Sequence, residues 1–123
     1  MRIINTGKMP QANGHYSQCI EHNGILYISG QLPGNPKVMK ISEDIESQTK
    51  LVLEKIDLIL EQAGSSRYKV IQMRIYIQDI DLWDRVNRVY AGFFGVHKPV
   101  RCIVPTGRLH YGCLIEAEAV AYL

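Results

Sequence analysis

Residues 70–78, VIQMRIYIQ, alternate between apolar and polar side chains along the whole segment. Successive side chains of a β-strand point to opposite faces of a sheet, so the pattern predicts a strand with Ile71, Met73, Ile75 and Ile77 on a buried face. A second alternation, IEAEAVA, follows at 115–121. The chain is therefore expected to build a sheet with two different faces, and the remaining segments must cover the apolar one.

Three further segments have the composition of strands. The runs 15–21 and 25–31 flank HNG, in which Asn-Gly is typical of a tight hairpin turn because both residues tolerate positive φ. The last third of the chain adds strands at 100–105 and 113–122. These segments predict one antiparallel hairpin near the N-terminus and two strands near the C-terminus.

Two segments have helical periodicity. From about residue 42 to residue 63, apolar side chains recur at spacings of three, four and seven, acidic residues occupy the first turn, and Gly64 follows as a stop. A second helix is predicted over 82–94, with Asp81 as its N-cap. Its buried stripe is expected to consist of Val86, Val89, Tyr90 and Phe93.

The predicted order is thus β, β, α, β, α, β, β. A chain of 123 residues is long enough for one core, so we expect a single α+β domain over 1–123, with both helices on one face of the sheet.

The last two strands suggest which residues share each face. If they pair antiparallel around Gly107 and Arg108, Arg101 lies opposite Glu116. The helix face then carries Val100, Cys102, Val104, Ile115, Ala117, Ala119 and Ala121. The open face carries Arg101, Ile103, Glu116, Glu118 and Val120, joined by Tyr27, Ser29, Arg74 and Tyr76. A mixed aromatic, aliphatic and charged face without a covering layer predicts a homo-oligomer, with small-ligand sites between subunits.

Composition argues against several classes of function. The 14 basic and 12 acidic residues are scattered, so no basic stripe indicates a nucleic acid as partner. No apolar run is long enough to span a membrane, and MRIINTGKMP is interrupted too early for a signal peptide. Three cysteines without CxxC spacing fit a reducing compartment, and the four histidines lack metal-ligand spacing. We expect a cytoplasmic protein with no metal site and no membrane partner.

Five motifs together resemble one family. They are GHYSQ at 14–18, ISGQLP at 28–33, VNRVYAGFF at 86–94, PVRC at 99–102 and IEAEAVA at 115–121. In order and spacing they resemble the Rid/YjgF family of reactive intermediate deaminases, also called the endoribonuclease L-PSP family. The resemblance implies a chorismate-mutase-like fold and a homotrimer with clefts between subunits. It also implies hydrolysis of 2-aminoacrylate-type enamines and imines to 2-keto acids and ammonia, without a metal or organic cofactor.

The same resemblance implies roles for individual residues. Arg101 corresponds to the arginine that binds the substrate carboxylate, and Glu116 to the acid that positions a water and moves its proton. Five further positions correspond to the lining of the cleft or its surroundings: Tyr16, Ser29, Gly30, Asn87 and Ile103. Ile103 stands where the best-known deaminases have cysteine, and the segment 105–113 and His15 also depart from their pattern.

Other interpretations remain open from the residues alone. Arg101 and Glu116 could form only a structural ion pair, and Tyr16 and Asn87 could serve packing. Trp83, Phe93 and Phe94 are more simply helix-packing residues than a ligand box. The protein could also be a non-catalytic carboxylate-binding or regulatory trimer. Ribonuclease activity or translation inhibition is a third class, which the scattered charge does not favour.

Overall fold

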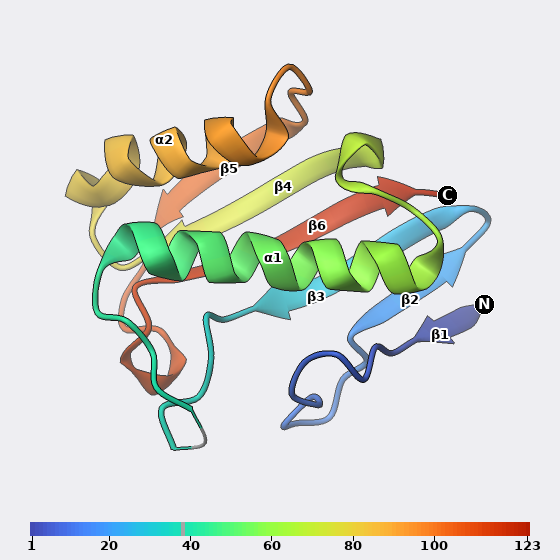
Figure 1. Cartoon of the computed structure of the whole chain (residues 1–123), viewed down its shortest axis with the longest axis horizontal. Helices are drawn as coiled ribbons and strands as arrows, with labels where there is room; N and C mark the ends of the chain where they lie inside the picture. The colour runs from blue at the N-terminus through green and yellow to red at the C-terminus, as the bar shows by residue number, and fades with distance from the viewer. Residues whose placement is uncertain (38) are drawn as a thin grey trace.

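The computed structural model describes residues 1–37 and 39–123 and contains a six-stranded mixed sheet covered on one face by two helices (Figure 1). The strands are β1 (Arg2–Ile4), β2 (Cys19–His22), β3 (Ile25–Gln31), β4 (Val70–Ile77), β5 (Val100–Pro105) and β6 (Ile115–Tyr122). The helices are α1 (Ile45–Ala63) and α2 (Trp83–Phe94). The predicted α+β class is confirmed, and the sequence prediction missed only the short edge strand β1.

The strand order β1-β2-β3-β6-β4-β5 corrects one predicted pairing. β5 and β6 are not neighbours, because β4 lies between them. β4 pairs antiparallel with β6 and parallel with β5, and α2 forms the crossover that a parallel connection requires. Arg101 therefore lies beside Met73, whereas Glu116 lies beside Tyr76, so the predicted pairing of Arg101 with Glu116 is wrong.

The parallel register also reverses the predicted faces of β5. Arg101 and Ile103 are on the helix face with Met73 and Ile75. Cys102 and Val104 are on the open face beside Arg74 and Tyr76. The faces predicted for β6 are correct, since Ile115, Ala117, Ala119 and Ala121 are buried beneath the helices.

The N-terminal hairpin forms as the Asn-Gly pair predicts. Asn23 and Gly24 both have positive φ, at 51° and 80°, which matches the twist of the two strands they connect. In β4 the register shifts between Val70 and Gln72, so Ile71 is exposed rather than buried. The alternation predicted for this strand holds from Met73 onward.

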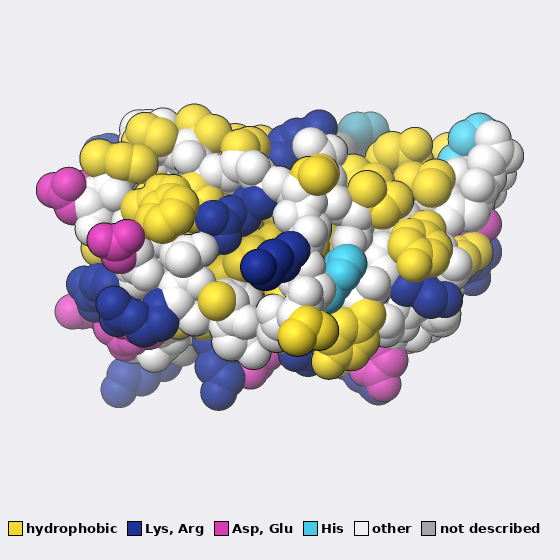
Figure 2. Space-filling model, turned by 90° about the horizontal axis from the view of Figure 1, so that it is seen from above, with side chains coloured by type: hydrophobic (Ala, Val, Ile, Leu, Met, Phe, Trp, Pro, Cys, Tyr) yellow, Lys and Arg dark blue, Asp and Glu magenta, His cyan; other side chains and the backbone are white. Residues whose placement is uncertain are grey.

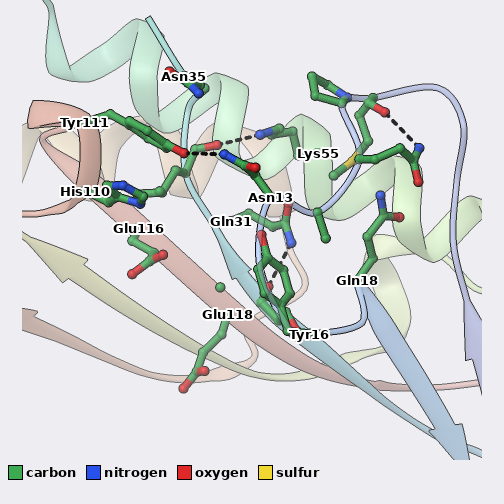
Figure 3. A pocket seen from close by; sticks show the side chains of 18 of the residues that line it. Asn13, Tyr16, Gln18, Gln31, Asn35, Lys55, His110, Tyr111, Glu116 and Glu118 are labelled. Atoms are coloured by element: carbon green, nitrogen blue, oxygen red, sulfur yellow. Dashed lines mark hydrogen bonds between the residues drawn. The ribbon is translucent and has the colours of Figure 1, made fainter. Parts of the chain in front are cut away.

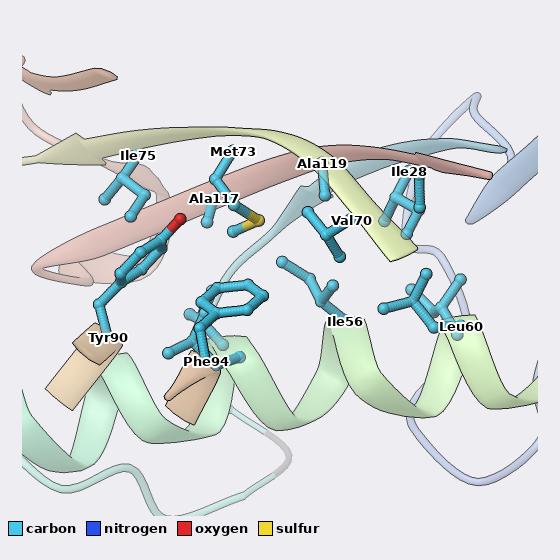
Figure 4. Close-up of a cluster of buried hydrophobic side chains, with 14 of the residues drawn as sticks. Ile28, Ile56, Leu60, Val70, Met73, Ile75, Tyr90, Phe94, Ala117 and Ala119 are labelled. Atoms are coloured by element: carbon cyan, nitrogen blue, oxygen red, sulfur yellow. The ribbon is translucent and has the colours of Figure 1, made fainter. Parts of the chain in front are cut away.

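The helices pack over the centre of the sheet. Figure 4 shows Ile56 and Leu60 of α1 and Phe94 of α2 directed toward Val70, Met73 and Ala119 of the sheet. Helix α1 begins at Ile45, with Asp44 as N-cap accepting a hydrogen bond from the Ser47 amide. A bidentate ion pair from Arg85 to Glu46, with both distances 2.7 Å, joins the two helices at the surface.

The start of α2 differs from the prediction. The N-cap is Leu82, and a short 3-10 turn over Ile80–Leu82 precedes the helix. Asp79, rather than Asp81, provides the side-chain cap of that turn by accepting a hydrogen bond from the Asp81 amide. The buried residues of α2 are Val86, Tyr90 and Phe94, while Phe93 is only partly buried.

Candidate functional site

A cleft with a volume of about 910 Å³ lies at the end of the sheet where β3 leaves it (Figure 3). Its walls come from residues 9–13, the end of β3 and the loop that follows, the segment around His110, and the open face of β6. Four of the residues predicted for the site line it: Tyr16, Ser29, Gly30 and Glu116. These segments are far apart in sequence and meet only through the sheet topology.

A bulge in β3 shapes this cleft. The pairing of β3 with β6 shifts between Ile28 and Gln31, so Ser29 and Gly30 leave the regular ladder. The Ser29 amide and hydroxyl instead donate to the Gln18 and Ser17 carbonyls, at 3.0 and 2.6 Å. A Cβ at Gly30 would lie 3.0 Å from Glu116 Oε2. The bulge therefore places a residue without a side chain beside this carboxylate.

Glu116 is the partly buried carboxylate of the cleft. Burial raises its pKa, nearby Glu118 raises it further, and His110 lowers it. Glu116 makes no side-chain hydrogen bond with any described residue, whereas Glu118 accepts one from Tyr76 at 3.0 Å and forms an ion pair with Arg74 at 3.4 Å. A carboxylate with a raised pKa, and with oxygens that no described side chain occupies, can exchange a proton with a bound molecule.

Arg101 belongs to a second, separate groove beneath α2. Its guanidinium donates to Asn87 Oδ1 at 2.8 Å and lies 4.7 Å from the ring centre of Tyr90 and 5.4 Å from that of Trp83. This groove has a volume of about 450 Å³ and also contains Asn87. Arg101 and Asn87, both predicted for the site, thus lie together, but in a groove that does not contain Glu116.

The two grooves open on different faces of the sheet. The Glu116 cleft includes the open face, whereas Arg101 points toward the helices from the edge strand β5. Figure 2 shows the molecule from above, the side of α2 and β5 in Figure 1, with basic side chains set among hydrophobic ones. One chain thus presents a carboxylate site and a guanidinium site without bringing them together. The side chain of Ile103, also predicted for the site, packs against the core.

Apolar side chains remain exposed on the open face and at the β5 edge. Tyr27 and Val100 have 51% and 63% of their surfaces exposed, and Val104 has 39%. Cys102 is exposed among them. Exposed aromatic and aliphatic groups of this kind are typical of a surface that another molecule covers.

The Tyr90 hydroxyl is buried and, within residues 1–37 and 39–123, has no hydrogen-bond partner. Burial raises the pKa of Tyr90 to about 12, although the positive charge of Arg101 lowers it in part. The neutral ring therefore serves as a packing surface for the guanidinium. Trp83, predicted only as a packing residue, also contacts Arg101.

Several residues of the cleft were not predicted. Lys55, His110, Tyr111, Asn13 and Asn35 all line it. The sequence pattern could have indicated the position of Lys55. This residue lies one helical turn from the buried Val52 and Ile59 and therefore flanks the apolar stripe of α1. The loop residues have no periodic pattern that could place them.

The described part of the chain holds neither a group of three His, Cys, Asp or Glu side chains arranged for a metal ion nor a helix long and apolar enough to cross a membrane.

The sequence of this chain is similar to those of known proteins. The family model described as endoribonuclease L-PSP matches residues 6–123. RutC family protein PH0854 of Pyrococcus horikoshii is 44% identical over 98% of this chain and 96% of its own. TdcF of Escherichia coli, which carries the name of a reactive intermediate deaminase, is 34% identical over 98% of this chain and 95% of its own.

Solved structures agree with the fold. TdcF with bound serine superposes with a TM-score of 0.93 at 33% identity, covering 100% of this chain and 99% of TdcF. The Rid protein YyfA of Yersinia pestis superposes with a TM-score of 0.93 at 41% identity, covering 99% of this chain and 98% of YyfA.

Proposed function

This chain belongs to the endoribonuclease L-PSP family, whose members include Rid and RutC proteins, and from this membership and the two grooves we propose that it hydrolyses 2-imino acids to 2-keto acids and ammonia. The site is composite: one copy provides Glu116 and its cleft, and a second copy provides Arg101. The observation that carries the proposal is the Glu116 carboxylate beside the Gly30 backbone: burial raises its pKa, and no residue among 1–37 and 39–123 forms a side-chain hydrogen bond with it.

Residues of the two grooves together supply the groups that this chemistry needs. The Arg101 guanidinium keeps donors free beyond its single bond to Asn87 among the described residues, and can hold the substrate carboxylate in a bidentate pair. The Glu116 carboxylate accepts a proton from water as the water oxygen bonds to the imine carbon. Glu116 then gives this proton to nitrogen, which leaves a hydroxyl and an amino group on the same carbon. A second transfer moves the hydroxyl proton through Glu116 to nitrogen, so that the carbon–nitrogen bond breaks as the carbonyl forms, releasing ammonia and the keto acid.

A homotrimer is part of this proposal. The exposed apolar groups of the open face and the β5 edge support an interface between copies, and such an interface would bring Arg101 of one copy toward Glu116 of another. The single chain holds these residues on opposite faces, so oligomerisation is required for the proposed activity.

The test measures keto-acid release from imines that an amino-acid oxidase or a PLP-dependent dehydratase generates in situ. The wild-type protein is expected to accelerate release above the spontaneous rate. An absence of acceleration with every imine, in folded and oligomeric protein, would favour the carboxylate-binding or regulatory alternative.

Ribonuclease activity is less favoured, because Glu116 and Glu118 in the cleft would repel the phosphates of RNA.

Replacing Arg101 with alanine is expected to weaken substrate binding. A hydrogen bond to a charged group contributes about 1.5–3 kcal/mol, so KM should rise about 10- to 100-fold while the proton-transfer groups remain in place. Arg101→Lys keeps the charge but not the planar pair of donors and should recover only part of the loss. An unchanged KM in Arg101→Ala would show that the guanidinium does not bind the substrate.

Replacing Gly30 with alanine is expected to displace the Glu116 carboxylate. The new methyl group would lie 3.0 Å from Oε2, so the flexible end of Glu116 must move by a few tenths of an ångström. A kcat lower by about tenfold is expected, because proton transfer depends steeply on position. Gly92→Ala on α2 is the matched control, since no atom within 4 Å would meet its Cβ. Equal kcat values in both variants would contradict this role of Gly30.

A further inference from the structure

The part of the cleft next to α1 carries a positive charge that the proposed chemistry does not use. Lys55 reaches from α1 to the loop after β3, where its Nζ donates to the Leu32 carbonyl at 2.8 Å. This is its one hydrogen bond with the residues that the structure describes, so two of the three ammonium donors remain available. Burial lowers the pKa of Lys55. The neighbouring groups therefore do not fully offset the loss of water around its ammonium group.

Further hydrogen-bond donors line the same part of the cleft. The Asn35 side chain accepts a bond from the Lys37 amide through Oδ1, which leaves its NH₂ group without a partner in the described segments. Asn13 donates to the Tyr111 hydroxyl oxygen at 3.1 Å, so the Tyr111 hydroxyl proton is also available. Figure 3 shows Lys55, Asn13, Asn35 and Tyr111 gathered on one side, with Glu116 and Glu118 on the other.

The position of Tyr111 is fixed by an unusual backbone. Tyr111 has φ of 63°, in the left-handed region that residues with side chains seldom adopt, and Gly112 follows with φ of 72°. The Tyr111 ring stacks on His110 with ring centres 3.6 Å apart. Such strain persists only where the surroundings hold it, and here it directs the hydroxyl toward Asn13.

The two ends of the cleft have opposite electrostatic character. Glu116 and Glu118 bring carboxylates to one end of the cleft, and Lys55 brings an ammonium group to the other. A ligand with an anionic group at each end would meet Arg101 of the second copy with one and Lys55 with the other, while its central carbon faces Glu116.

We propose that Lys55, with Asn13, Asn35 and Tyr111, binds the side-chain carboxylate of the substrate, so that the preferred substrates are imines of dicarboxylic amino acids. This inference rests on the proposed function, because it assigns the substrate class of the same cleft. The physical reason is that an anion would satisfy the free donors and balance the partly buried ammonium charge.

A binding experiment tests the inference separately from turnover. Calorimetric titration compares 2-oxoglutarate with 2-oxobutyrate, which are keto acids with and without the second carboxylate. Wild type should bind 2-oxoglutarate more tightly, and Lys55→Met should weaken only that binding, by about 10- to 100-fold. Lys50→Met is the matched control, because Lys50 lies on the same helix with an exposed side chain. Lys55→Gln keeps a donor for the Leu32 carbonyl and serves if the methionine variant fails to fold.

The turnover experiment uses imines of glutamate and of 2-aminobutyrate made in situ. Loss of activity with the glutamate imine alone in Lys55→Met, together with the binding result, supports the inference. Equal binding of both keto acids by wild type, or equal effects of Lys55→Met and Lys50→Met, would overturn it. Selective binding of 2-oxoglutarate without turnover of any imine would retain Lys55 as a carboxylate receptor and refute the deaminase proposal.

Discussion

Mixing the Arg101→Ala and Glu116→Gln proteins, after dissociation and reassembly together, should restore imine hydrolysis at low substrate concentration, where Arg101→Ala is slow because its KM is raised and Glu116→Gln is slow because its kcat is lowered. In a composite site the intact Glu116 of one copy meets the intact Arg101 of the other. With random one-to-one mixing, about one site in four receives both intact residues, so about a quarter of the wild-type rate should return. Keto-acid release measured before and after subunit exchange gives the result.

The physical basis of this expectation is the register of the sheet. Arg101 aligns with Met73 on the helix face and Glu116 aligns with Tyr76 on the open face, so a single chain cannot bring them to one substrate. A site built from one chain would show no recovery in the mixture. Two controls complete the experiment: each variant taken alone through the same treatment, and mixing without dissociation. Absence of recovery in a mixture shown to contain exchanged oligomers would refute the composite site.

The Glu116→Gln variant should lose about 10²- to 10⁴-fold in kcat, the range expected when the group that exchanges a proton with the substrate is removed. The amide has nearly the same shape, so binding of a keto acid should change little. Calorimetry of 2-oxobutyrate binding beside kcat distinguishes lost chemistry from lost structure. A Glu116→Gln protein that retains most of its kcat would show that another group moves the proton.

The pH profile gives a second measurement on the same residue. As a base Glu116 acts in its ionised form, so activity should fall as the pH drops through its pKa, which burial and Glu118 raise. His110 lowers that pKa, so His110→Gln should move the acidic limb of the profile to higher pH. An acidic limb at the same pH in both proteins would mean that a different group controls it.

The stability of the folded chain should change with pH in the direction opposite to the change in activity. The pKa of Glu116 is higher in the folded chain than in the unfolded chain, so its favourable contribution is present at low pH and is lost as the pH rises through the folded value. Above the pKa of the folded chain the ionised, partly buried carboxylate therefore opposes folding. Thermal unfolding of Glu116→Gln at neutral pH is expected to occur at a slightly higher temperature than that of wild type.

Local signals allowed most of the fold to be predicted. The Asn23–Gly24 turn and the periodicity of α1 each express a preference of a few neighbouring residues, and both elements form where expected. The exposure of Ile71 was not predictable in the same way, because a shift in strand register depends on the partner strand. The edge strand β1 is only three residues long and carries too short a pattern to detect.

The sequence prediction was wrong about the face of the sheet on which Arg101 lies. The cause of this error is non-local. Val100, Cys102 and Val104 are all apolar or weakly polar, so they were assigned to the core. They lie instead on the open face, where apolar side chains remain exposed in the single chain. The sequence order of β4, α2 and β5 held the necessary information, since a strand, a helix and a strand in succession favour a parallel pair.

The aromatic surroundings of Arg101 affect the entropy of binding. A long side chain loses rotamer freedom when it grips a ligand, which costs about 0.5–1.5 kcal/mol for each side chain fixed at that moment. The Tyr90 and Trp83 rings and the Asn87 oxygen already restrict the guanidinium within the single chain. Folding therefore meets this entropic cost in advance, and an arriving carboxylate encounters a receptor that is already oriented.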